Sequence, residues 1–176
     1  MTTPVPEAWL RGPLPGIPSQ LQPLGYALTG AVEDVEKAVA GLDPVALWYE
    51  PGGAASVGFH LLHLAGSTDR LLTYALGAPL TDIQRAAIGA ERSLPEPRPA
   101  LHALVAAWRD TVARSLAQFR VTPESTLDDP RPVGRAQLPS TVRGLLTHAA
   151  EHAQRHVGQI VTTAKIVRGL GIGEHA

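Results

Sequence analysis

The chain contains no cysteine among its 176 residues. Disulfides, thiolate metal ligands and a nucleophilic thiol of the protein itself are therefore excluded. A metal site in this chain would have to use His, Asp and Glu, and a reactive thiol would have to come from another molecule. The absence of cysteine also favours a reducing compartment.

Long apolar runs and an excess of charge of one sign are missing as well. No stretch of about 18 uncharged apolar residues could span a membrane, and the N-terminus lacks the basic start and apolar run of a signal peptide. Fifteen Lys and Arg, which are scattered, against sixteen Asp and Glu leave a net charge of −1, which is not typical of a nucleic-acid-binding protein. We therefore expect a cytoplasmic protein that acts on a small molecule and binds neither nucleic acid nor membrane.

Proline divides the chain into an arm and one domain. Five prolines fall among the first eighteen residues, and proline lacks the backbone donor that regular structure needs. We expect residues 1–18 to form an extended arm. A single domain commonly contains on the order of 100–200 residues, so residues 19–176 are expected to form one helical domain.

Four segments of this domain carry apolar residues at the three-and-four spacing of an amphipathic helix. Ser19 and Ser56 are the expected N-caps of the first two, Pro139-Ser140 opens the last, and Gly77 is a natural residue to follow the second. The predicted helices span about 19–42, 57–76, 100–120 and 140–168.

Two shorter signals lie between the long helices. Asp43 is expected to cap a short turn through Trp48, and Thr81 with Gln84 forms the capping box of a connecting helix. No alternation of period two appears, so the predicted class is all-α. Two long proline-containing connections favour a four-helix bundle with long crossover connections, whose order departs from simple up-down-up-down, although one crossover would be enough.

Five of the seven histidines are confined to two predicted helices. His148, His152 and His156 follow one another at four-residue intervals, and residues at this spacing are neighbours on one helix face. The helix at 57–76 adds His60 and His63. We expect His152 and His156 to supply two metal ligands and His63, which lies deeper in its helix than His60, to supply the third. The 148/152 pair has the same spacing and stays open as an alternative.

Three imidazoles without a fourth protein ligand would form an open metal site, which water or substrate completes. A divalent cation there would lower the pKa of a bound water or thiol. Imidazole favours zinc or nickel, with iron as an alternative. The other explanation of the histidines is that they are hydrogen-bonded residues of the bundle core.

Several polar residues lie close to these histidines in the sequence. Gln159 and Ser67 share helix faces with the predicted ligands and are candidates for cofactor binding, although they would also suit the polar end of a bundle. Glu151 is expected to pair with Arg155 at i+4. The dipeptide 69–70, Asp-Arg, is expected to face solvent.

Two motifs contain the predicted ligands, SVGFHLLHLA at 56–65 and HAQRHVGQI at 152–160. Together they resemble the DinB/YfiT-like metalloenzymes. In that family the third ligand precedes a Leu-Ala or Ile-Ala pair, and the last helix carries HxxxH. The resemblance implies a four-helix bundle, often a homodimer, with His63, His152 and His156 on zinc, nickel or a similar cation. Val157 stands where many relatives have Arg, which removes a cation beside the site.

The resemblance also implies a class of reaction. Characterised relatives include thiol-dependent S-transferases and a mycothiol-dependent isomerase. The function expected is therefore that of a metal-dependent transferase which activates a low-molecular-weight thiol such as bacillithiol, mycothiol or glutathione. The alternatives are a metal-dependent hydrolase of a small substrate and a non-catalytic, stress-associated metal-binding bundle.

Overall fold

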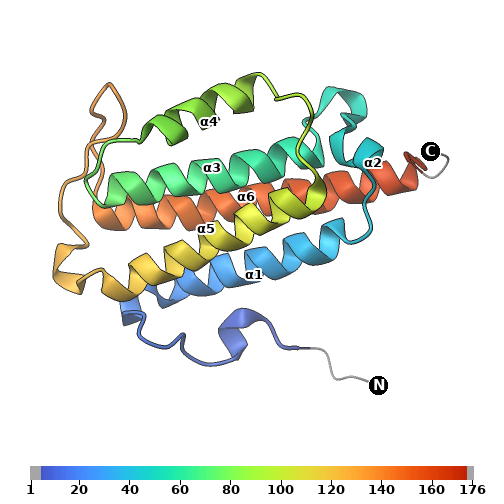
Figure 1. The fold of residues 1–176 in the computed structure, drawn as a ribbon. Helices are drawn as coiled ribbons and strands as arrows, with labels where there is room; N and C mark the ends of the chain where they lie inside the picture. The colour runs from blue at the N-terminus through green and yellow to red at the C-terminus, as the bar shows by residue number, and fades with distance from the viewer. Residues whose placement is uncertain (1–4, 174–176) are drawn as a thin grey trace.

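Four long helices form the body of the molecule (Figure 1). The structure is a computed structural model that describes residues 5–173, so the ends of the predicted arm and domain, 1–4 and 174–176, lie outside the described residues. The long helices are α1 (Gln22–Val39), α3 (Val57–Ala75), α5 (Leu101–Val121) and α6 (Val142–Gly169). Shorter elements are η1 (Ala8–Leu10), η2 (Ser19–Leu21), α2 (Pro44–Trp48), η3 (Pro51–Gly53), α4 (Asp82–Arg92) and η4 (Glu124–Thr126). The predicted all-α class is confirmed.

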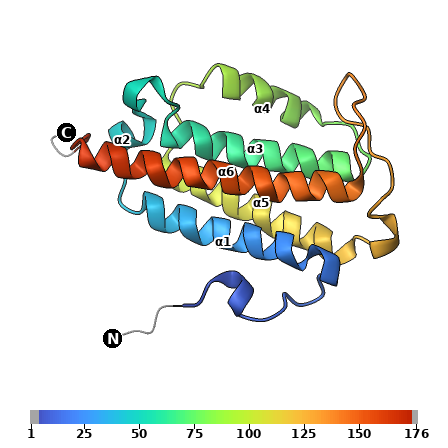
Figure 2. The same ribbon diagram turned by 180° about the vertical axis from the view of Figure 1, so that it is seen from behind.

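The helix order departs from up-down-up-down, as predicted. Helices α3 and α5 run in one direction and α1 and α6 in the other, and α4 returns the chain along the outer side of α3 (Figures 1 and 2). Helices α5 and α6 each pack against both α1 and α3. The second long connection, 122–141, stays at one end of the bundle, so α4 and its flanking loops form the one crossover between long helices of the described chain.

Side-chain caps at three predicted positions are present in the structure. The Ser56 hydroxyl accepts a hydrogen bond from the backbone N–H of Phe59 at the start of α3. Asp43 accepts from two backbone N–H groups of α2. Thr81 and Gln84 form both halves of a capping box. Local sequence chemistry therefore determines where α2, α3 and α4 begin.

The predicted starts of α1 and α6 are wrong by a few residues. Ser19 lies within η2 and makes no cap, and its hydroxyl donates to Glu124 instead. Helix α6 is capped by Thr141, whose hydroxyl accepts from the N–H of Gly144, while the Ser140 carbonyl accepts from the N–H of Arg131. The contacts of Ser19 with Glu124 and of Ser140 with Arg131 lie outside the local pattern from which the two starts were predicted.

The N-terminal segment lies against α1. Arg11 forms a two-pronged ion pair with Glu33 of α1, at 2.6 and 2.7 Å. The Gln22 side chain donates to the carbonyl oxygens of Leu14 and Ile17 and accepts from the N–H of Leu14. The segment therefore docks on the bundle through polar contacts, and it includes the short helix η1.

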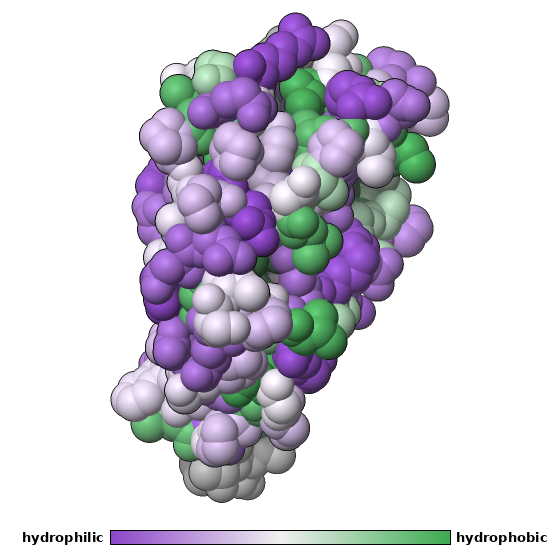
Figure 3. Space-filling model, turned by 90° about the vertical axis from the view of Figure 1, so that its left-hand side faces the viewer, coloured by the Kyte–Doolittle hydropathy of each residue, from purple (hydrophilic) through white to green (hydrophobic). Residues whose placement is uncertain are grey.

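The core between the long helices is apolar and well covered. Its largest fully buried side chains include Trp108 and Phe119 of α5, Leu61 of α3 and Ile160 of α6. Viewed from the end that carries the 122–141 loop, hydrophobic residues are scattered among hydrophilic ones (Figure 3). In the described residues, no helix combines the length and the apolar character that a membrane span requires.

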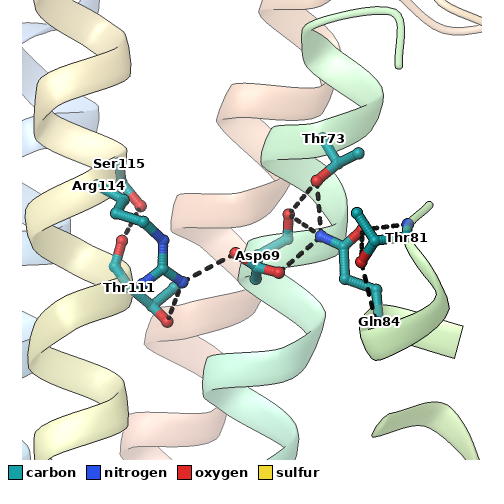
Figure 4. A network of polar contacts seen from close by, with 7 residues as sticks. All are labelled: Asp69, Thr73, Thr81, Gln84, Thr111, Arg114 and Ser115. Atoms are coloured by element: carbon teal, nitrogen blue, oxygen red, sulfur yellow. Dashed lines mark hydrogen bonds and ion pairs between the residues drawn. The ribbon is translucent and has the colours of Figure 1, made fainter. Parts of the chain in front are cut away.

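The crossover helix α4 is attached to α3 by polar contacts, and Asp69 is the centre of one group of them (Figure 4). Gln84 of α4 donates to the Asp69 carboxylate at 2.6 Å and to the Thr73 hydroxyl at 2.7 Å. Arg114 of α5 donates to the other oxygen of Asp69 at 2.8 Å. The expectation that Asp69 and Arg70 face solvent is therefore wrong, because both are engaged by neighbouring helices.

Candidate metal centre

Three histidine rings from two helices meet inside the bundle. His63 comes from α3, and His152 and His156 come from successive turns of α6. The Nε2 atoms of His63 and His152 are 3.1 Å apart, and the ring centroid of His156 lies 4.8 Å from that of His63 and 4.5 Å from that of His152. One nitrogen from each ring lies within 4.8 Å of the others, so the three residues could hold a metal ion.

The donor set and its spacing fit a divalent transition metal. In a tetrahedral zinc site with Zn–N bonds of about 2.0–2.1 Å, neighbouring nitrogens are about 3.3–3.4 Å apart, close to the separation of the His63 and His152 nitrogens. The Nδ1 atom of His152 is buried and has no hydrogen-bond partner among the described residues. The other ring nitrogen of His152, Nε2, faces His63 and is the candidate ligand atom.

Electrostatics favour the neutral form of His152 and His156. Burial, followed by repulsion from His152 and the other nearby histidines, lowers the pKa of His156 to about 4. Burial, followed by repulsion from the neighbouring His63 and His148, also lowers the pKa of His152. A metal binds the neutral imidazole, so near neutral pH protons compete weakly for these two nitrogens.

A carboxylate that the sequence did not predict lies behind His63. Glu91 of α4 accepts a hydrogen bond from His63 Nδ1 at 2.7 Å, and Arg70 donates to both of its oxygens, at 2.5 and 3.1 Å. Burial alone would raise the pKa of Glu91, but the hydrogen bonds from His63 and Arg70 outweigh it and hold that pKa below its ordinary value. Glu91 lies 28 positions after His63 on a different helix, so no local spacing indicated the contact.

The two remaining histidines of the motifs occupy different positions. His60 is only 7% exposed, and its Nδ1 lies 3.0 Å from Nδ1 of His156. His148 is exposed and pairs with Glu151, which also forms the predicted ion pair with Arg155. His148 therefore lies one turn outside the three-ring group, with its ring centroid 5.5 Å from that of His152, whereas a ring nitrogen of His60 lies 3.0 Å from one of His156.

A groove of about 740 Å³ begins at His60 and follows α6. Its polar lining includes Arg155, Gln159, Thr162 and Thr163. Gln159, a predicted cofactor-binding residue, thus lies in a groove next to the histidines, and its role there stays a prediction. Ser67 is buried, and its hydroxyl donates to the carbonyl of Leu64 on its own helix, so its cofactor contact also stays a prediction.

A search of curated proteins finds no significant match. The family model of the DinB superfamily matches residues 27–160, a range that contains all three histidines of the centre, the whole of α3, the part of α6 that carries His152 and His156, and the crossover between α3 and α5. The chain therefore belongs to the DinB superfamily of metal-binding helical bundles.

Proposed function

We propose that this protein is a divalent-metal-dependent transferase that uses a low-molecular-weight thiol as its nucleophile. The observation that carries the proposal is a three-imidazole centre next to His60, which lines an open groove, in a chain that has no cysteine of its own. Three protein ligands leave a position for substrate. Imidazole nitrogens favour zinc or nickel, with iron as an alternative.

Residues of the centre would bind the metal, and residues of the groove would bind the rest of the thiol molecule. His63, His152 and His156 would hold the cation, which when bound supplies a Lewis acid that favours the thiolate form of a thiol. Arg155, Gln159 and Thr162 offer hydrogen-bonding groups along the groove for the carboxylates and hydroxyls that such thiols carry. The thiolate sulfur forms a bond to an electrophilic carbon, and the leaving group departs with its bonding electrons, so no oxidant or reductant is needed.

The test is conjugation of a haloarene by the metal-loaded protein. Glutathione, mycothiol and bacillithiol are each mixed with the protein and a chloro-dinitrobenzene, and conjugate formation is followed by absorbance. His156→Ala should abolish the metal-dependent rate, whereas His148→Ala should retain it, because His148 lies outside the three-ring group. Equal rates for wild type and His156→Ala with all three thiols would contradict the proposal.

A further inference from the structure

A partly buried line of three residues runs outward from the metal centre to the crossover helix. His63 of α3 contacts Glu91 of α4, and Glu91 in turn contacts Arg70, about two turns after His63 on α3. The side chains of Arg70 and Glu91 are 13% and 10% exposed, so this ion pair is largely shielded from water. A carboxylate shielded in this way needs its partners, because a buried unpaired charge is costly.

The contacts of Glu91 determine which nitrogen of His63 carries the proton. Arg70 donates to both carboxylate oxygens, which keeps Glu91 ionised. An ionised carboxylate can only accept hydrogen bonds, so Nδ1 of neutral His63 must be the N–H donor at 2.7 Å. The lone pair of that ring is then on Nε2, the atom that lies 3.1 Å from Nε2 of His152.

We propose that Glu91 is a positioning residue of the metal centre, which fixes the tautomer and the ring orientation of His63 and is itself held by Arg70. The inference rests on the metal binding of the proposed function and does not depend on the reaction. Outer carboxylates that orient a metal-binding histidine commonly contribute about 10- to 100-fold to metal affinity. Glu91 itself is not a ligand, since it contacts the nitrogen of His63 that points away from His152.

Gly66 supplies the space in which this carboxylate lies. A Cβ added at Gly66 would be 2.6 Å from Oε1 of Glu91 and 3.0 Å from Nη1 of Arg70, too close for either atom to stay in place. Glycine inside a helix ordinarily costs about 0.5–1 kcal/mol relative to alanine. Because Gly66 has no side chain, the Glu91–Arg70 pair can lie close to the backbone of α3.

The position of Glu91 along the bundle is also fixed at the other end of α4. Gln84 binds Asp69 and Thr73 of α3 near the start of α4 (Figure 4), and Glu91 binds Arg70 and His63 near its end. Two attachments on one face, seven residues apart, prevent α4 from sliding or rotating on α3. The crossover helix thereby places a carboxylate at a defined point beside the metal centre.

Metal titration tests the role of Glu91 directly. Nickel affinity is measured by calorimetry and by the visible spectrum of the bound ion for wild type, Glu91→Ala, Glu91→Gln and Asp82→Asn. We expect a loss of about 10- to 100-fold for Glu91→Ala and a smaller loss for Glu91→Gln, whose amide oxygen can still accept from Nδ1. Asp82→Asn, which changes an exposed carboxylate at the opposite end of α4, should bind as wild type does. Wild-type affinity in Glu91→Ala would overturn the inference.

A spectroscopic measurement on the metal-free protein separates this inference from the proposed function. Nitrogen-15 NMR of the imidazole rings should show His63 as the Nδ1–H tautomer in wild type, and a mixture of tautomers in Glu91→Ala. This result would support the role of Glu91 even if no thiol transfer were found. The Nε2–H tautomer in wild type would overturn the role of Glu91, whatever the protein's activity.

A glycine pair gives a test that does not alter the carboxylate. Gly66→Ala should lower nickel affinity, because the new methyl group displaces Glu91 and Arg70. Gly89→Ala, on α4 itself, meets no atom within 4 Å and should leave the affinity unchanged. Circular dichroism confirms that both variants are folded. Unchanged affinity in folded Gly66→Ala, with Glu91→Ala also unchanged, would contradict the inference.

Discussion

The Nε2 atoms of His63 and His152 lie 3.1 Å apart although the two residues are 89 positions apart in the chain. Glu91 occupies the proton-bearing side of His63, so the lone pair of His63 faces the other ring. A cation between such nitrogens would bind the folded chain and not the unfolded one. Metal binding and folding should therefore be coupled.

Nickel or zinc is expected to raise the thermal stability of the protein. At a free metal concentration about 100 times the Kd, the gain is about 2.7 kcal/mol, which corresponds to a rise in Tm of roughly 5–10 °C for a chain of this size. Differential scanning calorimetry with metal and with chelator measures the shift. His152→Ala should show no such rise, and an identical rise in this variant would mean that the metal binds elsewhere.

The metal-free protein should lose stability as the pH falls below about 6.5. The pKa of His156 is lowered to about 4 in the folded chain, so between these two values the unfolded chain binds a proton that the folded chain does not. Its contribution is present above about pH 6.5 and is lost as the pH falls towards 4. Thermal unfolding in chelator should show a steeper loss over this range for wild type than for His156→Gln; parallel curves would refute this.

Gln159 is expected to contribute to thiol binding and not to metal binding. Its side chain lines the groove that begins at His60. Gln159→Ala should raise the KM for the thiol about 2- to 10-fold, which matches the net 0.5–1.5 kcal/mol of one hydrogen bond, while the nickel Kd stays unchanged. Steady-state kinetics with the best thiol measures this, with Gln20→Ala as a control outside the groove. A changed nickel Kd would assign Gln159 to the metal centre instead.

We expect the volume of the Trp108 side chain to contribute more to the stability of the fold than its indole N–H does. The side chain is fully buried, and its Nε1 has no hydrogen-bond partner among the described residues. Trp108→Ala should cost about 3–5 kcal/mol through the cavity that it leaves. Trp108→Phe removes the unpaired N–H as well as some volume, so its cost should be much smaller. Urea unfolding compares the two, and equal costs would contradict this explanation.

Gly58 should not tolerate a side chain, although it lies in a helix. A Cβ there would be 2.7 Å from the ring of Trp48, which packs over the start of α3 and donates to the carbonyl of Pro99. Gly58→Ala is expected to destabilise the protein. Gly30→Ala in α1, where a Cβ meets nothing within 4 Å, should instead stabilise it by up to about 1 kcal/mol. Changes of opposite sign in the unfolding free energy of the two variants, relative to wild type, would confirm the contrast.

The parts of the fold that the sequence predicts well are those that local chemistry determines. The apolar spacing places the four long helices, and short-range caps such as Ser56 and Thr81 mark where α3 and α4 begin. Helix α1 nevertheless ends at Val39 and not at 42, because Ala40 leaves the helical conformation (ψ 121°) and Gly41 follows it with φ +72°. A homodimer stays a prediction.

The histidines were predictable and their surroundings were not. Four-residue spacing brings His152 and His156 to one helix face. A metal site in a bundle then needs a third ligand at a similar level on a facing helix, and His63 is that residue. The contacts of Glu91 with His63 and of His60 with His156 depend on how α4 and α6 pack on α3. Such contacts leave no periodic signal, because each partner lies on another helix at an arbitrary distance along the chain.

The direction of α3 and α5 has a consequence for which insertions the chain can accept. Because these two helices run in parallel, residues 76–100 have to travel the length of the bundle, and they also carry Glu91 to its place beside His63. A residue inserted within α4 would turn every later side chain of that helix by about 100° and remove the carboxylate from the ring. The loop at 132–137, by contrast, turns at one end of the bundle, and it does not have to place a residue beside the metal centre. We therefore expect insertions and deletions among related chains to occur in this loop and not in the interior of α4.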